Sequence, residues 1–290
     1  MIRLASPLAL DVYVAPYLPI QSFLPSWDAN RQATWPASSV SLLSGEKEAV
    51  LIDALITNAE AANVVAWIRE KKKTLTAVYI THGHGDHFFG LNTILAAFPE
   101  AKAVALPEVM PGIEAQVGPD QMAFWGGVFP DQIPERPRLP EAMQDGVITL
   151  EGRELRPIIV GQSDTFPSTV VHVPDLDAVV GGDVAYNGVH CWLAETDRDK
   201  RQGWLVSLDL IAALKPKVVV AGHKDPSTRD DDATSILDAT RAYIRDFDAN
   251  VDECGSPREI FDKMMQRYGD RGNPFSLWAA AEGVSQQLRH

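Results

Sequence analysis

The chain has 290 residues, enough for one large domain, and a net charge of −13. This acidity argues against nucleic acid or an anionic membrane as a partner, because both bind basic surfaces. No run of about 18 apolar residues predicts a transmembrane helix, and the N-terminus lacks the pattern of a signal peptide. The two cysteines, Cys191 and Cys254, are too few for a disulfide scaffold, so we expect a cytoplasmic protein.

Strands are expected where short apolar runs end at turn residues, and helices where apolar residues recur every three or four positions. In chain order the expected strands are 12–14, 40–43, 49–53, 77–80, 102–106, 147–150, 155–160, 169–173, 178–180 and 217–221. The expected helices are 58–72, 88–98, 203–214, 231–247, 257–268 and 275–288. Strands followed by a helix, twice over, predict a layered α/β protein with helices outside two sheets.

Residues 108–143 interrupt this pattern. They are rich in proline and include Phe124, Trp125 and Phe129. A segment of this kind, between positions 107 and 146, is either a lid or substrate wall or a well-packed excursion over the core. The sequence leaves both interpretations open.

The most distinctive stretch is the loop that follows the expected strand 77–80 and reads Thr-His-Gly-His-Gly-Asp-His from Thr81. It holds three of the seven histidines in the chain, His82, His84 and His87, together with Asp86. Imidazole and carboxylate are the usual protein ligands of Zn²⁺ and its first-row neighbours. The loop therefore predicts a metal site.

Two further ligand types follow strands in the second half of the chain. Asp183 comes after the expected strand 178–180, and His223 comes after the expected strand 217–221. A glycine precedes each of them, which lets the backbone bend and approach its neighbours closely. Because strand ends at one edge of a sandwich converge, we expect both side chains to join the histidine loop.

The run His-x-His-x-Asp-His from His82, with the Gly-Asp and Gly-His pairs, resembles the metallo-β-lactamase superfamily of metal-dependent hydrolases, in its glyoxalase II-like and lactonase-like branch. The resemblance covers roughly residues 40–224. It implies a four-layer αββα sandwich with two metal ions, Zn²⁺ or alternatively Mn²⁺ or Fe²⁺. It also implies that His82 and His84 bind the first metal and that Asp183 bridges the two. The second metal would be bound by Asp86, His87 and His223.

The chain departs from the family at the third histidine of the first site, where Gln162 stands in the segment Gly-Gln-Ser-Asp-Thr. Gln162 offers a neutral amide oxygen, a weaker Zn²⁺ ligand than imidazole. Asp164 lies two residues on, on the same side of an extended strand, and would favour a harder ion such as Mn²⁺ or Fe²⁺. The missing histidine leaves three possibilities for the first site. Gln162 ligates the metal weakly, Asp164 takes the place of the histidine, or the first site is largely empty. We favour two occupied sites with Gln162 or Asp164 near the first metal.

The expected activity is hydrolysis of an ester, lactone, thioester or amide bond in a small molecule. A bound metal lowers the pKa of water towards about 7, so hydroxide is the expected nucleophile, with Asp86 orienting or deprotonating it. Tyr186 and His190 follow Asp183 and are candidates for hydrogen bonding to a leaving group or oxyanion, or else they pack the loop. The alternatives are hydrolysis of phosphodiesters or sulfate esters, or a non-catalytic metal-binding or ligand-binding protein with a degraded first site.

We expect residues 1–230 to form the catalytic domain, with 107–146 as an insertion, and residues 231–290 to form a helical extension packed on it. This extension resembles the helical appendages of glyoxalase II-like proteins. It either walls the cleft or mediates formation of a homodimer. Trp27, Trp35, Trp125 and Trp192 lie in expected loops, where aromatic side chains can line an apolar substrate pocket.

Overall fold

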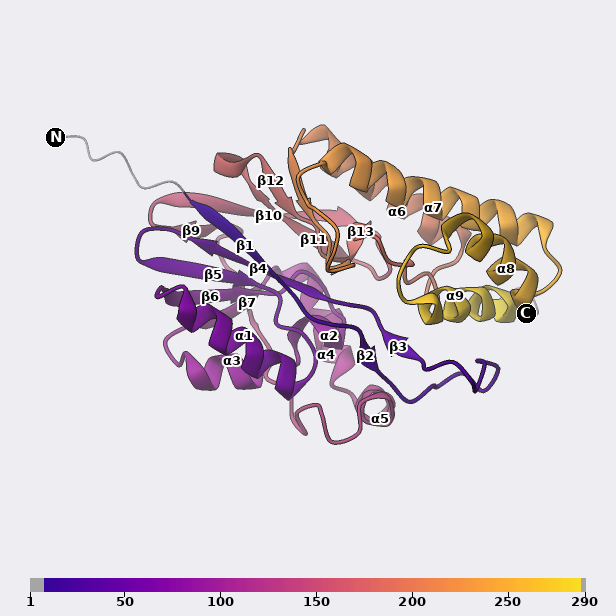
Figure 1. Cartoon of the computed structure of the whole chain (residues 1–290). Coiled ribbons are helices and arrows are strands. Elements are labelled where there is room, and N and C mark those ends of the chain that lie inside the picture. Colours follow the sequence, from indigo (N-terminus) through magenta and orange to yellow (C-terminus); the bar gives the residue numbers. More distant parts are fainter. Residues whose placement is uncertain (1–7, 288–290) are drawn as a thin grey trace.

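Two β-sheets lie face to face at the centre of the molecule, with helices on both outer sides (Figure 1). The structure is a computed structural model that describes residues 8–287, with side chains described as far as residue 284. The four-layer αββα arrangement expected from the sequence is confirmed.

Each sheet joins strands that are distant in sequence. The first sheet has the order β1 (Ala9–Val14), β4 (Ser39–Ser44), β5 (Glu48–Ile52), β6 (Thr74–Tyr79), β7 (Lys102–Ala105) and β8 (Glu141–Ala142). The second has the order β14 (Val218–Val220), β12 (Ala178–Val180), β11 (Ser168–Val173), β10 (Arg153–Gly161) and β9 (Ile148–Leu150). Two short pairs complete the strands: β2 (Leu18–Pro19) with β3 (Thr34–Trp35), and β13 (Tyr186–Asn187) with β15 (His223–Lys224).

Successive side chains along the central strands point to opposite faces of their sheet, which explains why these strands are apolar on both sides. Leu43 of β4 packs between the sheets in one cluster with Val171 of β11. Its neighbour Leu42 belongs to a second cluster that includes the buried side chains of the helices. The same alternation separates Val179 from Val180 in β12. The two sheets are therefore stabilised by burial on both faces.

The helices described in the structure fall into four groups. The pair α1 (Asn58–Glu70) and α3 (Leu91–Ala97) covers the first sheet, and α6 (Arg198–Ala213) with α7 (Ala233–Glu253) covers the second (Figure 1). The C-terminal helices α8 (Pro257–Tyr268) and α9 (Pro274–Gln287) pack on each other, and they contact α7 and β3. Three short helices lie near the edge of the sandwich: α2 (Gly85–Phe88), α4 (Met110–Gln116) and α5 (Pro119–Val128).

Several elements differ from the sequence-based expectation; the helix expected at 231–247, for example, runs from Ala233 to Glu253. The helix expected at 88–98 is two helices, because the chain bends at Gly90, whose N–H donates to the carbonyl of Leu55. The helix expected at 203–214 begins five residues earlier, where the carboxylate of Asp197 accepts a hydrogen bond from the N–H of Lys200. Residues 107–146 contain α4, α5 and β8, so this insertion has regular structure of its own.

A buried ion pair joins α6 to α7. Nε of Arg201 donates to Oδ1 of Asp248 at 2.6 Å, and both side chains are buried. Replacing Arg201 by alanine is expected to lower the free energy of unfolding by about 3–5 kcal/mol, because Asp248 is left buried without its partner. The matched control is Arg198→Ala, which removes an exposed ion pair to Asp252 between the same helices and is expected to change stability by about 0–1 kcal/mol. Urea denaturation measures both, and equal effects would contradict the assignment.

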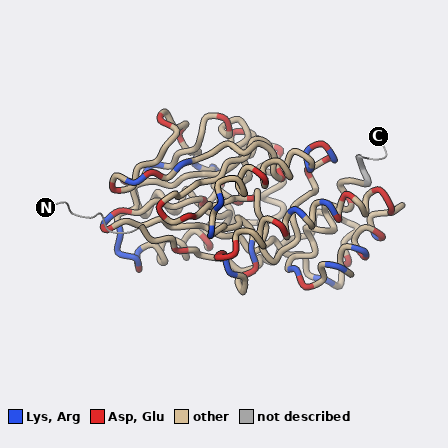
Figure 2. Tube along the Cα trace, turned by 90° about the horizontal axis from the view of Figure 1, so that it is seen from above, with Lys and Arg blue, Asp and Glu red and all other residues tan. Residues whose placement is uncertain are grey.

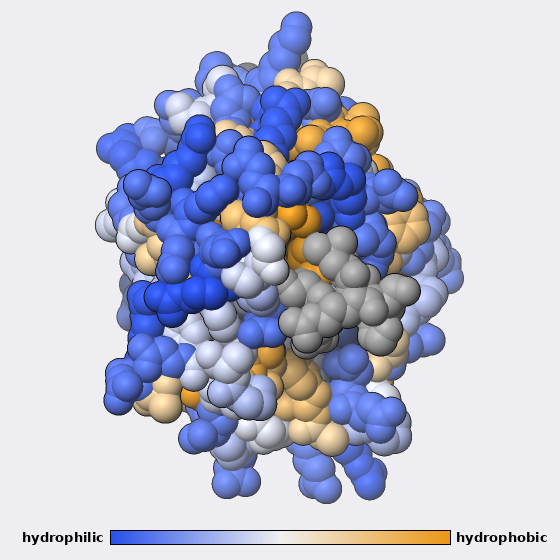
Figure 3. Space-filling model, turned by 90° about the vertical axis from the view of Figure 1, so that its right-hand side faces the viewer, coloured by the Kyte–Doolittle hydropathy of each residue, from blue (hydrophilic) through white to orange (hydrophobic). Residues whose placement is uncertain are grey.

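Charged side chains of both signs are spread along the whole chain trace (Figure 2). The end of the molecule that carries α8 and α9 exposes mainly hydrophilic residues with hydrophobic areas between them (Figure 3). Within residues 8–287, no helix has the length and apolar character needed to span a lipid bilayer.

Candidate metal centre

The predicted ligands lie at the edge where parallel strands of both sheets end. The histidine loop follows β6, which runs parallel to β5, while Asp183 and His223 follow the parallel strands β12 and β14. The approach is close enough to require glycine. A side chain at Gly222 would collide with the Asp183 carboxylate, and Gly182 has a φ of +47°. The expected convergence of these strand ends is therefore what the structure shows.

The ligand-type side chains form two adjacent groups. In each group one nitrogen or oxygen atom per residue lies within 4.8 Å of the others, and all members are buried. The first group contains His82, His84, Asp164 and Asp183, and the second contains Asp86, His87 and His223. These are the residues assigned to two metal sites from the sequence, with Asp164 in the first group.

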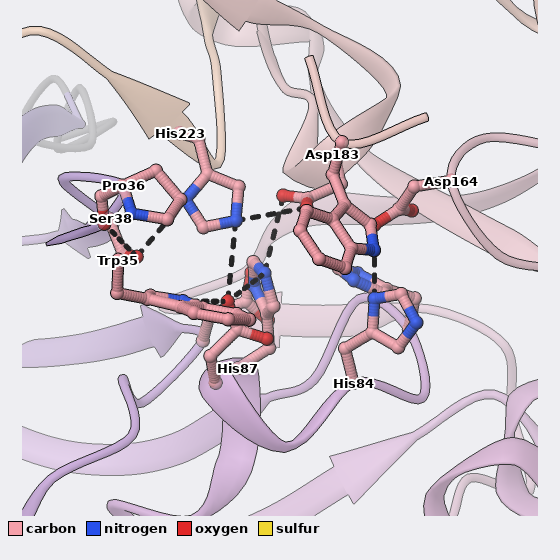
Figure 4. A network of polar contacts seen from close by, with 12 residues as sticks. Trp35, Pro36, Ser38, His84, His87, Asp164, Asp183 and His223 are labelled. Atoms are coloured by element: carbon pink, nitrogen blue, oxygen red, sulfur yellow. Dashed lines mark hydrogen bonds and ion pairs between the residues drawn. The ribbon is translucent and has the colours of Figure 1, made fainter. Parts of the chain in front are cut away.

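Asp183 lies between the two groups, as predicted for a bridging ligand (Figure 4). Its Oδ1 is 3.2 Å from Nε2 of His87, and its Oδ2 is 3.1 Å from Nε2 of His223. The hydroxyl of Tyr186 donates to the same Oδ2 at 2.9 Å. Tyr186 thus fixes the orientation of the carboxylate that connects the two groups.

The structure separates the two candidates for the missing histidine. Oδ2 of Asp164 lies 3.0 Å from Nδ1 of His84, while Oδ1 accepts hydrogen bonds from the Ser163 hydroxyl and the Thr165 N–H, both at 2.8 Å. The amide nitrogen of Gln162 instead donates to the backbone carbonyl of Ser163 at 2.9 Å. Asp164 is thus aimed into the first group, and the Gln162 amide is engaged with the main chain.

Nε2 of His82 is buried without a hydrogen-bond partner. Three more buried atoms, Nε2 of His87, Oδ2 of Asp164 and Oδ1 of Asp183, also lack a hydrogen bond and only lie at ion-pair distance from another member of their cluster. Buried polar atoms without partners are destabilising, and in native proteins they usually indicate an ion or water. Ligands about 2.1 Å from a tetrahedral ion lie roughly 3.4 Å apart, close to the separations found here. The donor set therefore fits divalent metal ions.

The protonation of the histidines agrees with this assignment. Burial holds the pKa of His82 well below its usual value, so its imidazole is neutral and able to ligate. Burial alone would also lower the pKa of His84 and His87, but the neighbouring carboxylates raise both well above their usual range. A divalent cation can take the place of these protons.

Three hydroxyl or carboxylate groups hold the outer ring nitrogens of the histidines. Nδ1 of His82 lies 3.0 Å from the Thr81 hydroxyl, and Nδ1 of His87 lies 3.0 Å from Oδ2 of Asp53. Nδ1 of His223 lies 3.1 Å from the Ser38 hydroxyl (Figure 4). Such outer partners fix the ring so that Nε2 faces the metal. None of these three partners was identified from the sequence. The available signal was the position of Asp53 after β5, the strand parallel to β6.

Replacing Asp53 by asparagine is expected to weaken metal binding at the second site about 10- to 100-fold, because His87 loses its charged partner. Asparagine tolerates the φ of +64° at this position. Competition with a chromogenic chelator measures the affinity. Asp11→Asn serves as the control and should leave the affinity unchanged, because it alters only the ion pair of Asp11 in β1 with Lys71, the residue that follows α1. Equal affinities for the two variants would show that His87 is oriented without Asp53.

A cavity of about 250 Å³ opens directly over the two groups. Asp86, Asp164, Asp183, His84 and His223 contribute to its floor, and Trp35, Phe124, Trp125 and Trp192 contribute aromatic walls. Helices α4 and α5 supply Gln116, Gln121, Phe124 and Trp125, so the insertion contributes part of the wall. Nε1 of Trp35 donates to Oδ2 of Asp86 at 3.0 Å, which ties one wall to the floor.

Other predicted residues lie elsewhere. His190 is fully buried beside Tyr243 of α7, its Nδ1 lies 3.0 Å from the Tyr243 hydroxyl, and burial lowers its pKa to about 3. It does not line the cavity, so we assign it no part in the chemistry. Tyr186 reaches the centre only through Asp183, because its hydroxyl is used there. Trp27 packs against Phe261 and Phe275 and does not line the cavity, whereas Trp35, Trp125 and Trp192 do.

Lys224 is not a solvent-exposed charge, and Cys191 is not a reactive thiol. Lys224, next to His223, is buried and forms an ion pair with Asp230, so it is not a surface charge. Burial raises the pKa of the Cys191 thiol to about 12, which keeps it protonated and unreactive.

The geometry can be compared with known proteins. The family model described as "Metallo-beta-lactamase superfamily" matches residues 33–223, more than half of the chain. The chain belongs to the metallo-beta-lactamase superfamily. The ligand cluster on this fold indicates divalent metal ions.

The curated relatives of this superfamily member are similar over short segments. Hydroxyacylglutathione hydrolase of Francisella tularensis subsp. novicida is 39% identical over 67 residues, which cover 23% of this chain and 25% of the relative. The enzyme of the same name from Synechococcus sp. (strain ATCC 27144 / PCC 6301 / SAUG 1402/1) is 44% identical over 52 residues, 18% of this chain and 20% of the relative. The chain thus matches a quarter or less of the length of these two relatives.

Solved structures are similar over most of the chain. A metallo-beta-lactamase family protein from Thermus thermophilus has a TM-score of 0.60 at 18% identity and covers 96% of this chain and 93% of its own. A metallo-beta-lactamase from Pontibacter korlensis has a TM-score of 0.58 at 18% identity, with coverage of 82% and 99%. At these identities the likeness shows the shared fold.

Proposed function

We propose that the protein hydrolyses an ester, lactone, thioester or amide bond of a small molecule, using two divalent metal ions, most simply Zn²⁺. The observation that carries this proposal is the position of the two ligand groups side by side on the floor of one aromatic-walled cavity. The volume of about 250 Å³ is close to the lower end of small-molecule pockets, roughly 300–1,000 Å³.

The metal ions supply a Lewis acid that polarises the scissile carbonyl and lowers the pKa of a coordinated water. Asp86 lines the cavity, and the Trp35 indole fixes one of its oxygens, so Asp86 is placed to orient the attacking water and accept its proton. Water adds to the acyl carbon, the bond to the leaving oxygen, sulfur or nitrogen breaks, and the leaving group takes up a proton. Tyr186 acts as a positioning residue, because it holds Asp183.

The lining of the cavity favours acyl transfer over phosphoryl or sulfuryl transfer. Of the described residues that line it, none is lysine or arginine. Enzymes that act on phosphoryl groups typically stabilise the developing charge with such cations in addition to metal. The identity of the metals follows from the ligands only in part, because the carboxylate of Asp164 in place of imidazole makes the first site harder and suits Mn²⁺ or Fe²⁺ as well.

The test uses the full chain loaded with Zn²⁺ and a panel of p-nitrophenyl acetate, a γ-lactone, a thioester, an anilide and bis-p-nitrophenyl phosphate. We expect turnover of at least one acyl compound, loss of that turnover after removal of metal by a chelator, and recovery when Zn²⁺ is restored. Turnover of the phosphodiester alone would overturn the proposal in favour of a phosphodiesterase. Stoichiometric metal without any turnover would favour a non-catalytic binding protein.

Two further expectations stand as proposals. Cys191 and Cys254 are both free thiols, which suits the reducing cytoplasm. Helices α8 and α9 offer a surface for a homodimer, and light scattering of the purified chain measures whether one forms.

A further inference from the structure

We propose that the substrate carries a cationic group, such as an ammonium, and that this group binds in an aromatic cage at the mouth of the cavity. The cage is formed by Trp35, Phe124, Trp125 and Trp192, with Glu195 as its carboxylate. This inference rests on the proposed acyl hydrolysis and specifies the substrate class on which it acts.

The aromatic rings surround one volume. The ring centroid of Trp35 lies 5.3 Å from that of Trp125 and 5.7 Å from that of Trp192, and Phe124 lies 5.2 Å from Trp125. A cation within about 6 Å of such a ring is attracted by its negative face. Groups of aromatic rings of this kind are a recurrent way to bind ammonium ions.

The hydrogen-bonding groups of the three indoles are already used. Nε1 of Trp35 donates to Asp86, Nε1 of Trp125 donates to Gln116 at 2.8 Å, and Nε1 of Trp192 donates to Glu195 at 3.0 Å. The rings therefore present their π-faces and edges to a ligand rather than N–H donors. This arrangement favours a cation or an apolar group over an anion that needs donors.

Glu195 gives the aromatic cage a negative charge that favours a cation. Three of its carboxylates, Asp86, Asp164 and Asp183, belong to the ligand groups, so divalent metals offset their charge. Glu195 is the remaining carboxylate of the lining, and no lysine or arginine is among the described lining residues. Its side chain is 54% exposed, so it meets an incoming ligand. The net charge of −13 also attracts cations from solution.

Glu195 also approaches the metal centre, because its Oε2 lies 3.6 Å from Nε2 of His84. A change at Glu195 can therefore alter metal binding as well as ligand binding. The two effects are separated by comparing two substrates on the same enzyme, because the metal content then cancels in the ratio of their kcat/KM values.

The experiment compares a choline ester with the 3,3-dimethylbutyl ester of the same acid, which has the same shape and no charge. We expect kcat/KM to be at least about tenfold higher for the choline ester. Glu195→Gln is expected to reduce this ratio to roughly one to three. Phe124→Leu keeps apolar volume but removes a ring, so it is expected to reduce the ratio only in part. Glu114→Gln removes a carboxylate from the exposed side of α4 and should leave the ratio unchanged.

Binding of tetramethylammonium, followed by tryptophan fluorescence, gives a readout that needs no turnover. We expect saturable quenching in the metal-loaded protein and about tenfold weaker binding in Glu195→Gln. A ratio near one in the unaltered enzyme, or faster hydrolysis of an ester of the same acid whose alcohol part carries a carboxylate in place of the ammonium, overturns the cationic-substrate inference alone. If neither ester and no acyl compound of the panel is hydrolysed, the proposed acyl hydrolysis is contradicted, and the tetramethylammonium titration decides whether the cage binds cations.

Discussion

Replacing Asp183 by asparagine is expected to lower kcat/KM on the order of 1,000-fold and to release metal from both sites. Each oxygen of this carboxylate faces a histidine of the second group, and the side chain is also a member of the first group. Asparagine keeps the size of the side chain but removes the charge that offsets two cations. Steady-state kinetics and elemental analysis of the same preparations measure the two effects.

Asp262→Asn is the matched control for this variant, because Asp262 is an exposed carboxylate of α8 far from the cluster in sequence. It is expected to retain full activity and metal. An Asp183→Asn protein with two metals per chain and more than about a tenth of the activity would show that this carboxylate does not join the two sites.

Replacing Asp164 by alanine is expected to reduce the metal content from two ions per chain to one and to lower kcat/KM on the order of 100-fold or more. The reason is the position of Asp164 in the first group, where its Oδ2 lies beside His84 and is placed to serve as the third protein ligand. The comparison variant is Gln162→Ala, which removes a side chain whose amide is bonded to the main chain. It is expected to keep both metals and to change kcat/KM less than about threefold.

The opposite pattern, with metal lost from Gln162→Ala and retained by Asp164→Ala, would assign the third ligand to Gln162. Gln162→His distinguishes the two positions further. If position 162 cannot reach the first metal, a histidine placed there leaves the metal content at two ions per chain.

The sequence is sufficient to predict the ligands themselves, because they are rare residue types at the ends of apolar runs. His82, His84 and His87 account for three of seven histidines, and parallel strands deliver their ends to one edge of a sheet. The convergence of strand ends predicted that the two halves of the centre meet, and the family resemblance alone implied which residues bind which metal. The order of strands and helices predicted helices outside two sheets, and the family resemblance implied the four-layer αββα sandwich, which the structure confirms.

The choice between Gln162 and Asp164 could not be made from the strand pattern. Residues two apart share a face only while the strand stays regular. Strand β10 has a register irregularity between Ile159 and Gly161, and Gly161 has a φ of +98°. The chain therefore leaves the strand geometry just before Gln162, and the two side chains take different directions.

The outer partners of the centre were equally inaccessible from the sequence. Ser38 and Glu195 are common residue types in unremarkable positions, and only the packed structure places them beside histidine rings. Asp53 had a signal in its position after β5, but the sequence did not show that it meets His87. The same holds for His190, which shares a loop with Tyr186 but is directed towards Tyr243 of α7. Tertiary contacts between distant elements determine where these side chains lie, and local sequence patterns do not predict such contacts.

The central claim is that two metal ions occupy the cluster and that Asp164 completes the first site. A crystal structure of the Zn²⁺-loaded protein, with anomalous data collected above and below the zinc edge, tests it most directly. We expect two anomalous peaks, one ligated by His82, His84 and Asp164, one by Asp86, His87 and His223, with Asp183 between them. A single peak, or a first peak ligated by Gln162 with Asp164 turned away, would contradict the account.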